Sequence, residues 1–370
     1  MVLFIITILL FCCYSLLMLY YYRAWKAIPD YHPSGTAATR VTVIIPARNE
    51  EKNIDRLLSA LRQQSYPAAC TEIIVVDDHS TDATADIVRQ YPEVLLLQLK
   101  EDAINSYKKK AIEKGIAMAT GTFIVTTDAD CIPGPEWLQQ LLAFKEEKKS
   151  VFIAAPVQFT HNHSVLQTFQ ALDFLVLQGI TAAAVHKGVH SMCNGANMGY
   201  DKNAFTAVNG FAGIDHIASG DDMLLMHKIT DRFPGQVHYL KSAGAIVHTA
   251  PMPTWKSFFN QRIRWASKAT FYTDKRISAV LLLVYLFNLL FAALLIAGVF
   301  NTDYLFLLLG TWAAKTIVEY PFVYSVAVFF GETPLTRWFF FFQPLHILYT
   351  IISGLLGQFG PYEWKGRKVK

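Results

Sequence analysis

Long apolar stretches without charge constrain this chain more than any other feature of its sequence. Val2–Tyr22 holds no charged side chain and is long enough to cross a bilayer, which takes about 20 apolar residues. No basic segment follows Met1 and no small-residue cleavage site follows the stretch, so we expect an anchor and not a cleaved signal peptide. Arg23 and Lys26 come next, and because basic residues favour the cytoplasmic side, the anchor should end inside the cell.

The last third of the chain holds three more apolar stretches. Ile277–Thr302 is free of charge and should span the membrane, and Trp338–Tyr362 is the last of the three. Between them, Tyr304–Phe330 is interrupted by Lys315 and Glu319, which stand four residues apart and can pair. Three spans after a cytoplasmic domain would place the basic tail outside, against the usual charge bias. Either the last stretch is re-entrant or interfacial, or the bias fails here.

The composition points to a membrane partner and away from nucleic acid. Hydrophobic residues make up 53% of the 370 residues and charged residues only 17%, which is too apolar for a purely soluble protein of this size. The net charge is only +4, and the basic residues stand beside apolar stretches, as they do near a membrane surface. The five cysteines form no CxxC pair, so we expect a reducing compartment and neither a zinc site nor a disulfide framework.

Between about residues 40 and 250 the sequence has the texture of a soluble α/β domain. Apolar, strand-like runs alternate with polar helical segments, two of which are Glu50–Gln64 and Lys108–Thr120. The runs are RVTVIIPARN, EIIVVDDHS, VLLLQL, TFIVTTDAD and VFIAAPVQF. Because nearly continuous β-branched runs indicate strands that are buried on both faces, we predict a mostly parallel sheet.

The fourth strand-like run ends in two carboxylates, Asp128 and Asp130, which form a DxD pair. Two carboxylates at this spacing offer hard oxygen ligands to a divalent cation such as Mg²⁺ or Mn²⁺. Such a cation would bridge the diphosphate of a nucleotide-sugar and neutralise charge on the leaving group. Because Asp is also common in turns, the pair alone would indicate no more than the end of a strand.

Polar clusters also end the first two strand-like runs. Pro46–Glu50 follows the first run, and Asp77 and Asp78 follow the second. In open α/β sheets ligands bind beyond the carboxyl ends of the strands, so these clusters and the DxD pair should lie at one edge. Asn49 and Ser80 can also be read as helix caps. Two adjacent carboxylates repel each other, so a purely structural explanation of Asp77 and Asp78 would need a partner for them.

Five blocks of sequence, in order, resemble the family 2 glycosyltransferases. They are VTVIIPARNEEKNI, IIVVDDHSTDAT, TTDADCIPGPEWL, GANMGYDKNAFTAVNGF and GIDHIASGDDMLLMHKI. The resemblance covers about residues 41–268. It implies an α/β nucleotide-diphospho-sugar transferase domain of the GT-A type, with one Rossmann-like sheet, which is joined here to transmembrane helices. It also implies an enzyme of the hexosyltransferase type that inverts the anomeric configuration.

The resemblance implies roles for the residues that follow the strands. Pro46, Ala47 and Glu50 would line the nucleotide pocket, Asp77 would contact the base, and the DxD pair would serve the diphosphate and the metal. Similar enzymes carry GK-x-x-AL where this chain has YKKKAI, without the glycine. Lys108 is the best match for a lysine near the nucleotide, and a solvated helix start remains the alternative for it.

A second acidic pair, Asp221 and Asp222, follows Gly220 and precedes the apolar segment MLLMHKI. Acidic residues at a helix N-terminus complement the helix dipole, which is the structural explanation. The resemblance matches the pair to an acidic block of the family whose second member is the catalytic base. Asp222 would then take the proton from the acceptor hydroxyl, with Asp221 in support, and help of this kind contributes about 10²–10⁴-fold.

Residues 253–276 are basic and aromatic, and their large apolar side chains recur at helical spacing, which predicts an amphipathic helix at the membrane interface. This segment contains the motif Q-x-x-R-W, formed by Gln261, Arg264 and Trp265. The motif resembles that of cellulose, hyaluronan and poly-N-acetylglucosamine synthases and of ceramide glucosyltransferase. The resemblance implies that Trp265 faces the acceptor sugar and Arg264 the diphosphate, with Gln261 in support.

Basic residues flank the expected catalytic domain on both sides, so the domain should lie in the cytoplasm beneath the cell (inner) membrane of a multi-pass protein. They are Arg23, Lys26, Arg262, Arg264, Lys268, Lys275 and Arg276. The expected organisation is an anchor at 1–22, a catalytic domain at 23–252, an interfacial segment at 253–276, membrane segments at 277–362 and a basic tail at 363–370.

The sequence therefore predicts transfer of a sugar from a UDP-linked donor to a lipid, lipid-linked or glycan acceptor. Processive polysaccharide synthases are the alternative, but they usually carry more spans than this chain. A sugar nucleotidyltransferase would want a glycine-rich loop after the first strand, where this chain has PARNEE. A non-catalytic membrane scaffold or transport component would account for Lys315 and Glu319, because intramembrane charges are functional by default, but not for the acidic pairs or the QxxRW motif.

Overall fold

The computed structural model divides the chain into two compact units. The sheet unit comprises Ile28–Thr160 and Ala184–Ala250, and the helical unit comprises Met1–Ala27, His161–Ala183 and Pro251–Lys370. The residues described are 1–101, 106–189, 192–217, 219–268, 272, 274–359, 362–364 and 367–369, with the backbone alone from residue 358 on. The catalytic domain expected at 23–252 is thus interrupted, because residues 161–183 cluster with the helices.

A seven-stranded mixed sheet forms the centre of the sheet unit. Its order is β3 (Val94–Gln98), β2 (Thr71–Asp77), β1 (Val41–Ala47), β4 (Phe123–Thr126), β8 (Met198–Asp201), β6 (Phe152–Ala154) and β9 (Val237–Tyr239). The first four strands run parallel, as the sequence predicted, and β8 runs antiparallel to both of its neighbours. A second sheet joins β5 (Ile132–Pro133), β10 (Val247–Thr249) and β7 (Val157–Phe159).

The buried runs explain why the predicted strands form. In β1 every residue but Pro46 is buried, and β2 is buried from Ile73 to its end. Strands that are buried on both faces consist of nearly continuous apolar runs, which is why the sequence predicted them. The sequence gives no such signal for β8, which is four residues long and contains Gly199. A Cβ atom at that glycine would lie 2.4 Å from Phe123 of the neighbouring strand, so the close approach requires glycine.

Six α-helices lie in the described part of the sheet unit. They are α2 (Ile54–Arg62), α3 (Thr84–Val88), α4 (Tyr107–Met118), α5 (Trp137–Lys148), α7 (Lys202–Ala207) and α8 (Met223–Arg232). Two of them, α2 and α4, were predicted, although α2 begins four residues later than expected. Helix α4 packs on β1 and β2 through Ala111, Ile112 and Ile116, which are buried. This packing brings the N-terminus of α4 to the carboxyl ends of the strands.

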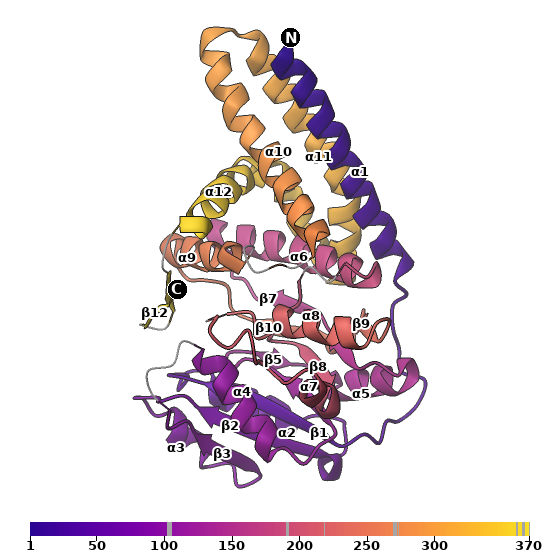
Figure 1. Cartoon of the computed structure of the whole chain (residues 1–370), viewed down its shortest axis with the longest axis vertical. Helices are drawn as coiled ribbons and strands as arrows, with labels where there is room; N and C mark the ends of the chain where they lie inside the picture. The colour runs from indigo at the N-terminus through magenta and orange to yellow at the C-terminus, as the bar shows by residue number, and fades with distance from the viewer. Residues whose placement is uncertain are drawn as a thin grey trace. The chain divides into compact units, whose positions relative to one another are not determined.

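The helical unit is built from long apolar helices and a shorter, basic and aromatic helix at Trp255–Ala266. They are α1 (Val2–Ala27), α6 (Val165–His186), α9 (Trp255–Ala266), α10 (Lys275–Phe300), α11 (Asp303–Phe329) and α12 (Phe339–Phe359). Helices α1, α10 and α11 lie side by side, and α6 and α9 run across their direction (Figure 1). After α12 the backbone forms a short hairpin of β11 (Tyr362–Trp364) and β12 (Arg367–Val369).

Among the described residues, four helical segments are long and apolar enough to cross a membrane, by length and composition alone. They are Val2–Ala27, Val165–His186, Lys275–Phe300 and Thr333–Gly357. The sequence predicted the first and third of these segments as spans, left open whether the fourth spans, and did not predict α6. The apolar window of α6 is 83% buried inside the protein, against 17–28% for the others, so protein covers its apolar surface. Helix α11, which contains Lys315 and Glu319, is not among the four.

Candidate functional site

The carboxyl ends of β1 and β2 meet at one edge of the sheet, as predicted. Ala47, the last residue of β1, stands opposite Asp77, the last residue of β2. Both are nearly inaccessible, with exposures of 2% and 4%. The backbone N–H of Asp78 donates to the carbonyl of Ala47 at 2.8 Å, which extends the pairing beyond the strands. Pro46 and Ala47 therefore lie beside Asp77 without any help from side-chain contacts.

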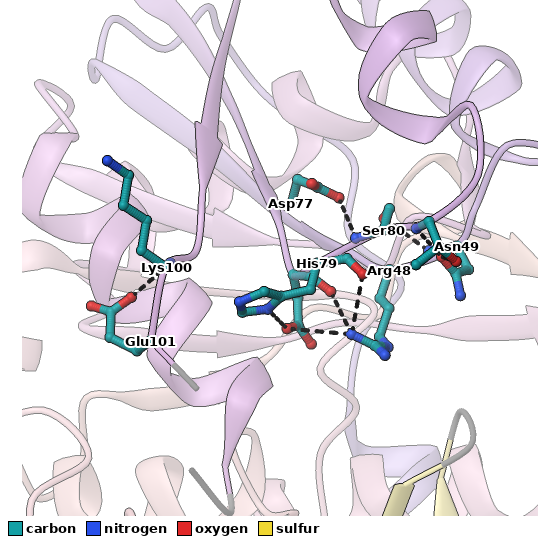
Figure 2. Close-up of polar contacts among 9 residues, drawn as sticks. Arg48, Asn49, Asp77, His79, Ser80, Lys100 and Glu101 are labelled. Carbon is teal, nitrogen blue, oxygen red and sulfur yellow. Dashed lines mark hydrogen bonds and ion pairs between the residues drawn. The ribbon is translucent and has the colours of Figure 1, made fainter. Parts of the chain in front are cut away.

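The two loops that follow these strands interlock through Asn49 and Ser80. The N–H of Asn49 donates to Ser80 Oγ at 3.0 Å, and Asn49 Oδ1 accepts from the N–H of Thr81 at 2.8 Å (Figure 2). Asn49 and His79 both adopt left-handed backbone angles, with φ of 52° and 53°. The expectation that Asn49 and Ser80 cap helices is wrong, because the capping positions of α2 and α3 are Asn53 and Ala83.

Asp77 and Asp78 each have their own partners, which explains how two adjacent carboxylates are tolerated. The carboxylate of Asp78 accepts from His79 Nδ1 at 2.9 Å and lies 3.8 Å from the Arg48 guanidinium (Figure 2). Arg48 also donates to the backbone carbonyl of Asp78 at 2.8 Å. Asp77 Oδ1 accepts from the N–H of Ser80 at 3.3 Å. The carboxylates therefore hold the loops at this edge of the sheet.

Glu50 lies in the first of these loops and is 8% exposed. Its N–H donates to Thr84 Oγ1 at 2.7 Å, and its Oε2 accepts from Asn53 Nδ2 at 2.7 Å. Thr84 is the first residue of α3, so this contact ties the loop after β1 to the helix after β2. A carboxylate placed this way can support a nucleotide pocket while it also stabilises the loop.

Lys108 joins the two acidic pairs of the sequence. Its Nζ lies 2.6 Å from Asp128 Oδ1 and 3.1 Å from Asp221 Oδ2. Burial would lower the pKa of the Lys108 ammonium, but the charges of Asp128 and Asp221 outweigh burial and raise it. The side chain is 20% exposed, so the alternative of a solvated helix start is wrong. The lysine stays charged and compensates two carboxylates.

Asp222 lies beside this ion pair network and begins α8. One of its carboxylate oxygens accepts from the N–H of Met223 at 2.7 Å, so the helix-cap explanation holds for it. A Cβ atom placed on Gly195 would lie 3.1 Å from Asp221 Oδ2, 3.2 Å from Lys108 Nζ and 3.7 Å from Asp222 Cβ. Glycine at 195 therefore lets its loop approach the charges closely. We name Lys108, Asp128, Asp221 and Asp222 the acidic cluster.

Lys109 is a residue of the site that sequence reasoning missed. It is 2% exposed, and its Nζ donates to the carbonyls of Ile214, Ile217 and Ser219 at 2.6, 2.7 and 2.9 Å. These carbonyls belong to the loop that leads into Asp221. Two adjacent lysines of α4 thus position the acidic cluster. Lys108 pairs with the carboxylates of Asp128 and Asp221, and Lys109 binds the backbone carbonyls that precede Asp221. A run of three lysines gives no sign of which one is buried.

The DxD pair fits a metal only in part. Asp128 and the exposed Asp130 follow β4 and offer carboxylate oxygens. Among the described residues, no group of three His, Cys, Asp or Glu side chains could hold a metal ion. Mg²⁺ commonly takes one or two carboxylates together with substrate phosphates and water. The donor set therefore fits a cation that a diphosphate helps to hold, and not a closed protein site.

The QxxRW residues lie in the helical unit, on α9. The helix begins at a capping box in which Thr254 and Ser257 bond each other's backbone. Arg264 and Trp265 are half-buried. Arg262, which was expected among the basic residues at the membrane surface, is 3% exposed and forms a 2.7 Å ion pair with Asp173. That expectation is wrong, because Arg262 lies on the face of α9 that packs against Asp173 of α6.

A family model described as glycosyl transferase family 2 matches residues 42–208. These residues form a family 2 glycosyltransferase domain. The match includes Lys108, the DxD pair and the residues that follow β1 and β2. It ends before Asp221 and Asp222 and before the QxxRW motif, so the roles of those residues rest on the resemblance of sequence blocks and on the geometry of the acidic cluster.

Two curated relatives are similar to parts of the chain. The glycosyltransferase AglE of Haloferax volcanii is 32% identical over 124 residues, which cover 33% of this chain and 40% of that protein. The probable glycosyltransferase YdaM of Bacillus subtilis is 26% identical over 249 residues, covering 65% of this chain and 58% of that protein. The chain therefore spans less than two thirds of the length of either relative.

A solved structure confirms the fold. The mannosyltransferase PcManGT from Pyrobaculum calidifontis, in complex with GDP-Man and Mn²⁺, matches with a TM-score of 0.62 at 21% identity. The match covers 95% of this chain and 99% of that chain. The predicted GT-A type of nucleotide-sugar transferase fold is correct, and its sheet is mixed rather than purely parallel.

We expect Lys109→Met to destabilise the sheet unit by on the order of 3 kcal/mol, because three backbone carbonyls lose their buried donor. Lys110→Met is the matched control on the same helix. Its side chain is 44% exposed and its ammonium lies 3.7 Å from Glu113, an exposed contact that contributes at most about 1 kcal/mol. Denaturant unfolding of the purified variants measures both. Equal effects of the two substitutions would show that Lys109 does not hold the loop.

Proposed function

We propose that the chain is a membrane-bound, inverting glycosyltransferase that moves a sugar from a UDP-linked donor to a lipid, lipid-linked or glycan acceptor. The acidic cluster carries this proposal. It combines a cation, two carboxylates and a helix-capping carboxylate at the carboxyl edge of the sheet, within and just after a family 2 domain. Sheets of this kind bind ligands at that edge.

The loops after β1 and β2 are proposed to hold the nucleotide. Pro46, Ala47 and Glu50 would line one side of the pocket, and Asp77 would accept a hydrogen bond from the base. Both carboxylates are buried and both loops are cross-linked by hydrogen bonds, so the pocket is organised before the donor arrives. An organised pocket loses less entropy when the donor binds.

Lys108 and the DxD pair are proposed to hold the diphosphate. Asp128 and Asp130 would ligate Mg²⁺ or Mn²⁺, and the bound ion would neutralise negative charge on the leaving group. Lys108 already lies 2.6 Å from Asp128, so its ammonium is placed to bind a phosphate oxygen as well. Lys108 and a bound ion would both stabilise the negative charge that develops on the diphosphate when its bond to the sugar breaks.

Asp222 is proposed to be the base. The acceptor oxygen attacks the anomeric carbon from the face opposite the diphosphate, and the sugar–diphosphate bond breaks as the new bond forms. The acceptor proton passes to the Asp222 carboxylate, and the nucleoside diphosphate leaves. One displacement of this kind inverts the anomeric carbon. The hydrogen bond from Met223 fixes one oxygen of Asp222 and so orients the carboxylate.

The helical unit is proposed to anchor the enzyme in the cell (inner) membrane and to serve the acceptor. On the resemblance of the QxxRW motif, we propose that Trp265 faces the acceptor sugar and Arg264 the diphosphate, with Gln261 in support. The apolar surfaces of α1, α10 and α12 are largely uncovered by protein, which suits helices that face lipid. A lipid or lipid-linked acceptor would reach such an enzyme directly from the bilayer.

Removal of divalent metal tests the role of the DxD pair. EDTA should abolish sugar transfer, and added Mg²⁺ or Mn²⁺ should restore it, because the diphosphate charge is no longer neutralised without the ion. Asp128→Asn should raise the KM for the donor as well as lower turnover. Transfer of labelled sugar from a nucleotide-sugar to membrane lipid measures both effects. Full activity in excess chelator would remove the DxD pair from metal chemistry.

Substitution of Asp222 tests the proposed base. Asp222→Asn keeps the size of the side chain but cannot take the hydroxyl proton, so turnover should fall roughly 10²-fold or more while donor binding stays near normal. Asp221→Asn should cost less, because Asp221 only shares the charge of Lys108. Asp215→Asn is the neutral control, since that carboxylate is 70% exposed. Wild-type turnover in Asp222→Asn would make Asp221 the candidate instead.

Thiol labelling tests the proposed orientation. Cys70 is partly exposed in the sheet unit, whereas Cys131 is buried and unsuitable as a reporter. In a variant without Cys12, Cys13 and Cys193, a membrane-impermeant maleimide added to intact cells should leave Cys70 unlabelled. Labelling should appear after permeabilisation, because the sheet unit is proposed to lie inside. Labelling of Cys70 in intact cells would place the sheet unit outside.

A further inference from the structure

A buried polar cluster lies in the helical unit. Asp173 of α6 is its centre, and this carboxylate is 6% exposed. Its Oδ2 accepts from Arg262 Nη2 at 2.7 Å, and its Oδ1 accepts from the Tyr349 hydroxyl at 2.6 Å. His346 Nδ1 lies 3.2 Å from the same Oδ1. The cluster therefore joins α6, α9 and α12, three helices that are far apart in the sequence.

The ion pair of this cluster is buried among aromatic side chains. Phe169, Phe258 and Tyr349 form a buried hydrophobic cluster around it. The Arg262 guanidinium lies 4.9 Å from the Phe258 ring centre and 5.9 Å from that of Tyr349, and its Nε has no hydrogen-bond partner in the described part of the chain. Buried ion pairs often stabilise a protein no more than apolar residues of the same volume. The rings of Phe169, Phe258 and Tyr349 already pack α6, α9 and α12 together, so we look for another role for the ion pair.

The cluster reaches the QxxRW motif through Arg262. Its guanidinium donates to Gln261 Oε1 at 3.3 Å and lies 4.3 Å from the Trp265 ring centre. One side chain thus contacts the first and the last residue of the motif. Phe174, next to Asp173, also packs on Trp265 with ring centres 6.1 Å apart. The orientation of Gln261 and Trp265 therefore depends on Arg262, and through Arg262 on the position of Asp173.

We propose that Asp173 and Tyr349 are positioning residues that fix Gln261 and Trp265 through Arg262. The inference rests on the proposed function, because it assumes that the QxxRW motif binds the acceptor. Tyr349 orients the Asp173 carboxylate, that carboxylate fixes the Arg262 guanidinium, and the guanidinium holds the amide of Gln261 and the ring of Trp265. None of the three groups that orient the motif needs to touch a substrate.

Two matched tyrosine variants test the proposal. Tyr349→Phe removes the hydrogen bond to Asp173 and keeps the ring, and Tyr14→Phe removes the hydrogen bond to Glu319, another buried carboxylate of the same unit. We expect Tyr349→Phe to raise the KM for the acceptor by about tenfold with the donor KM unchanged, because a bond to a charged group is lost. Tyr14→Phe should leave both KM values unchanged. An equal acceptor KM in Tyr349→Phe and wild type would overturn the proposal.

A readout without turnover separates this proposal from the proposed function. In protein labelled with 5-fluorotryptophan, the ¹⁹F resonance of Trp265, assigned with Trp265→Phe, should shift in Tyr349→Phe and in Asp173→Asn/Arg262→Gln, but not in Tyr14→Phe. The double variant avoids leaving a buried charge unpaired. An unshifted resonance would overturn the positioning role. A shifted resonance with a wild-type acceptor KM in Trp265→Ala would instead refute the assignment of the motif to the acceptor.

Discussion

The ion pairs of Lys108 are the interaction on which the proposed site depends. They join the start of α4, the turn after β4 and the approach to α8, three segments that are distant in sequence. Without a cation between them, Asp128 and Asp221 would repel each other in a partly buried place. The ammonium makes their proximity stable. It also places an ammonium where we propose that the diphosphate binds.

The surrounding framework serves this arrangement. Helix α4 is packed on β1 and β2, and the buried Lys109 next to Lys108 holds the loop before Asp221 by three backbone bonds. Gly195 leaves room for a loop beside the charges. The loops after β1 and β2 are cross-linked through Asn49 and Ser80. A rigid edge of this kind supports catalysis because its charges are already oriented when the substrate binds.

The sequence was sufficient where one local signal decides the structure. Apolar runs predicted β1 to β4. Because β2, β1 and β4 are parallel, Asp77 and Asp128 follow strands that end at the same edge of the sheet. The short strand β8 escaped prediction because its place depends on Phe123 of another strand. Lys109 and Arg262 escaped it for the same reason. Their burial is decided by the loop at 214–219 and by Asp173, which no pattern near these residues reveals.

In the function that we propose, the carboxyl edge of the sheet holds a nucleotide-sugar and the helices receive the acceptor. Incubation of the purified protein with radiolabelled nucleotide-sugars and membrane lipids, followed by determination of the anomeric configuration of the product, tests this most directly. We predict that a UDP-linked sugar labels the lipid fraction, with a configuration opposite to that in the donor. Failure of every nucleotide-sugar to label an acceptor, or a product that retains the donor configuration, would contradict the account.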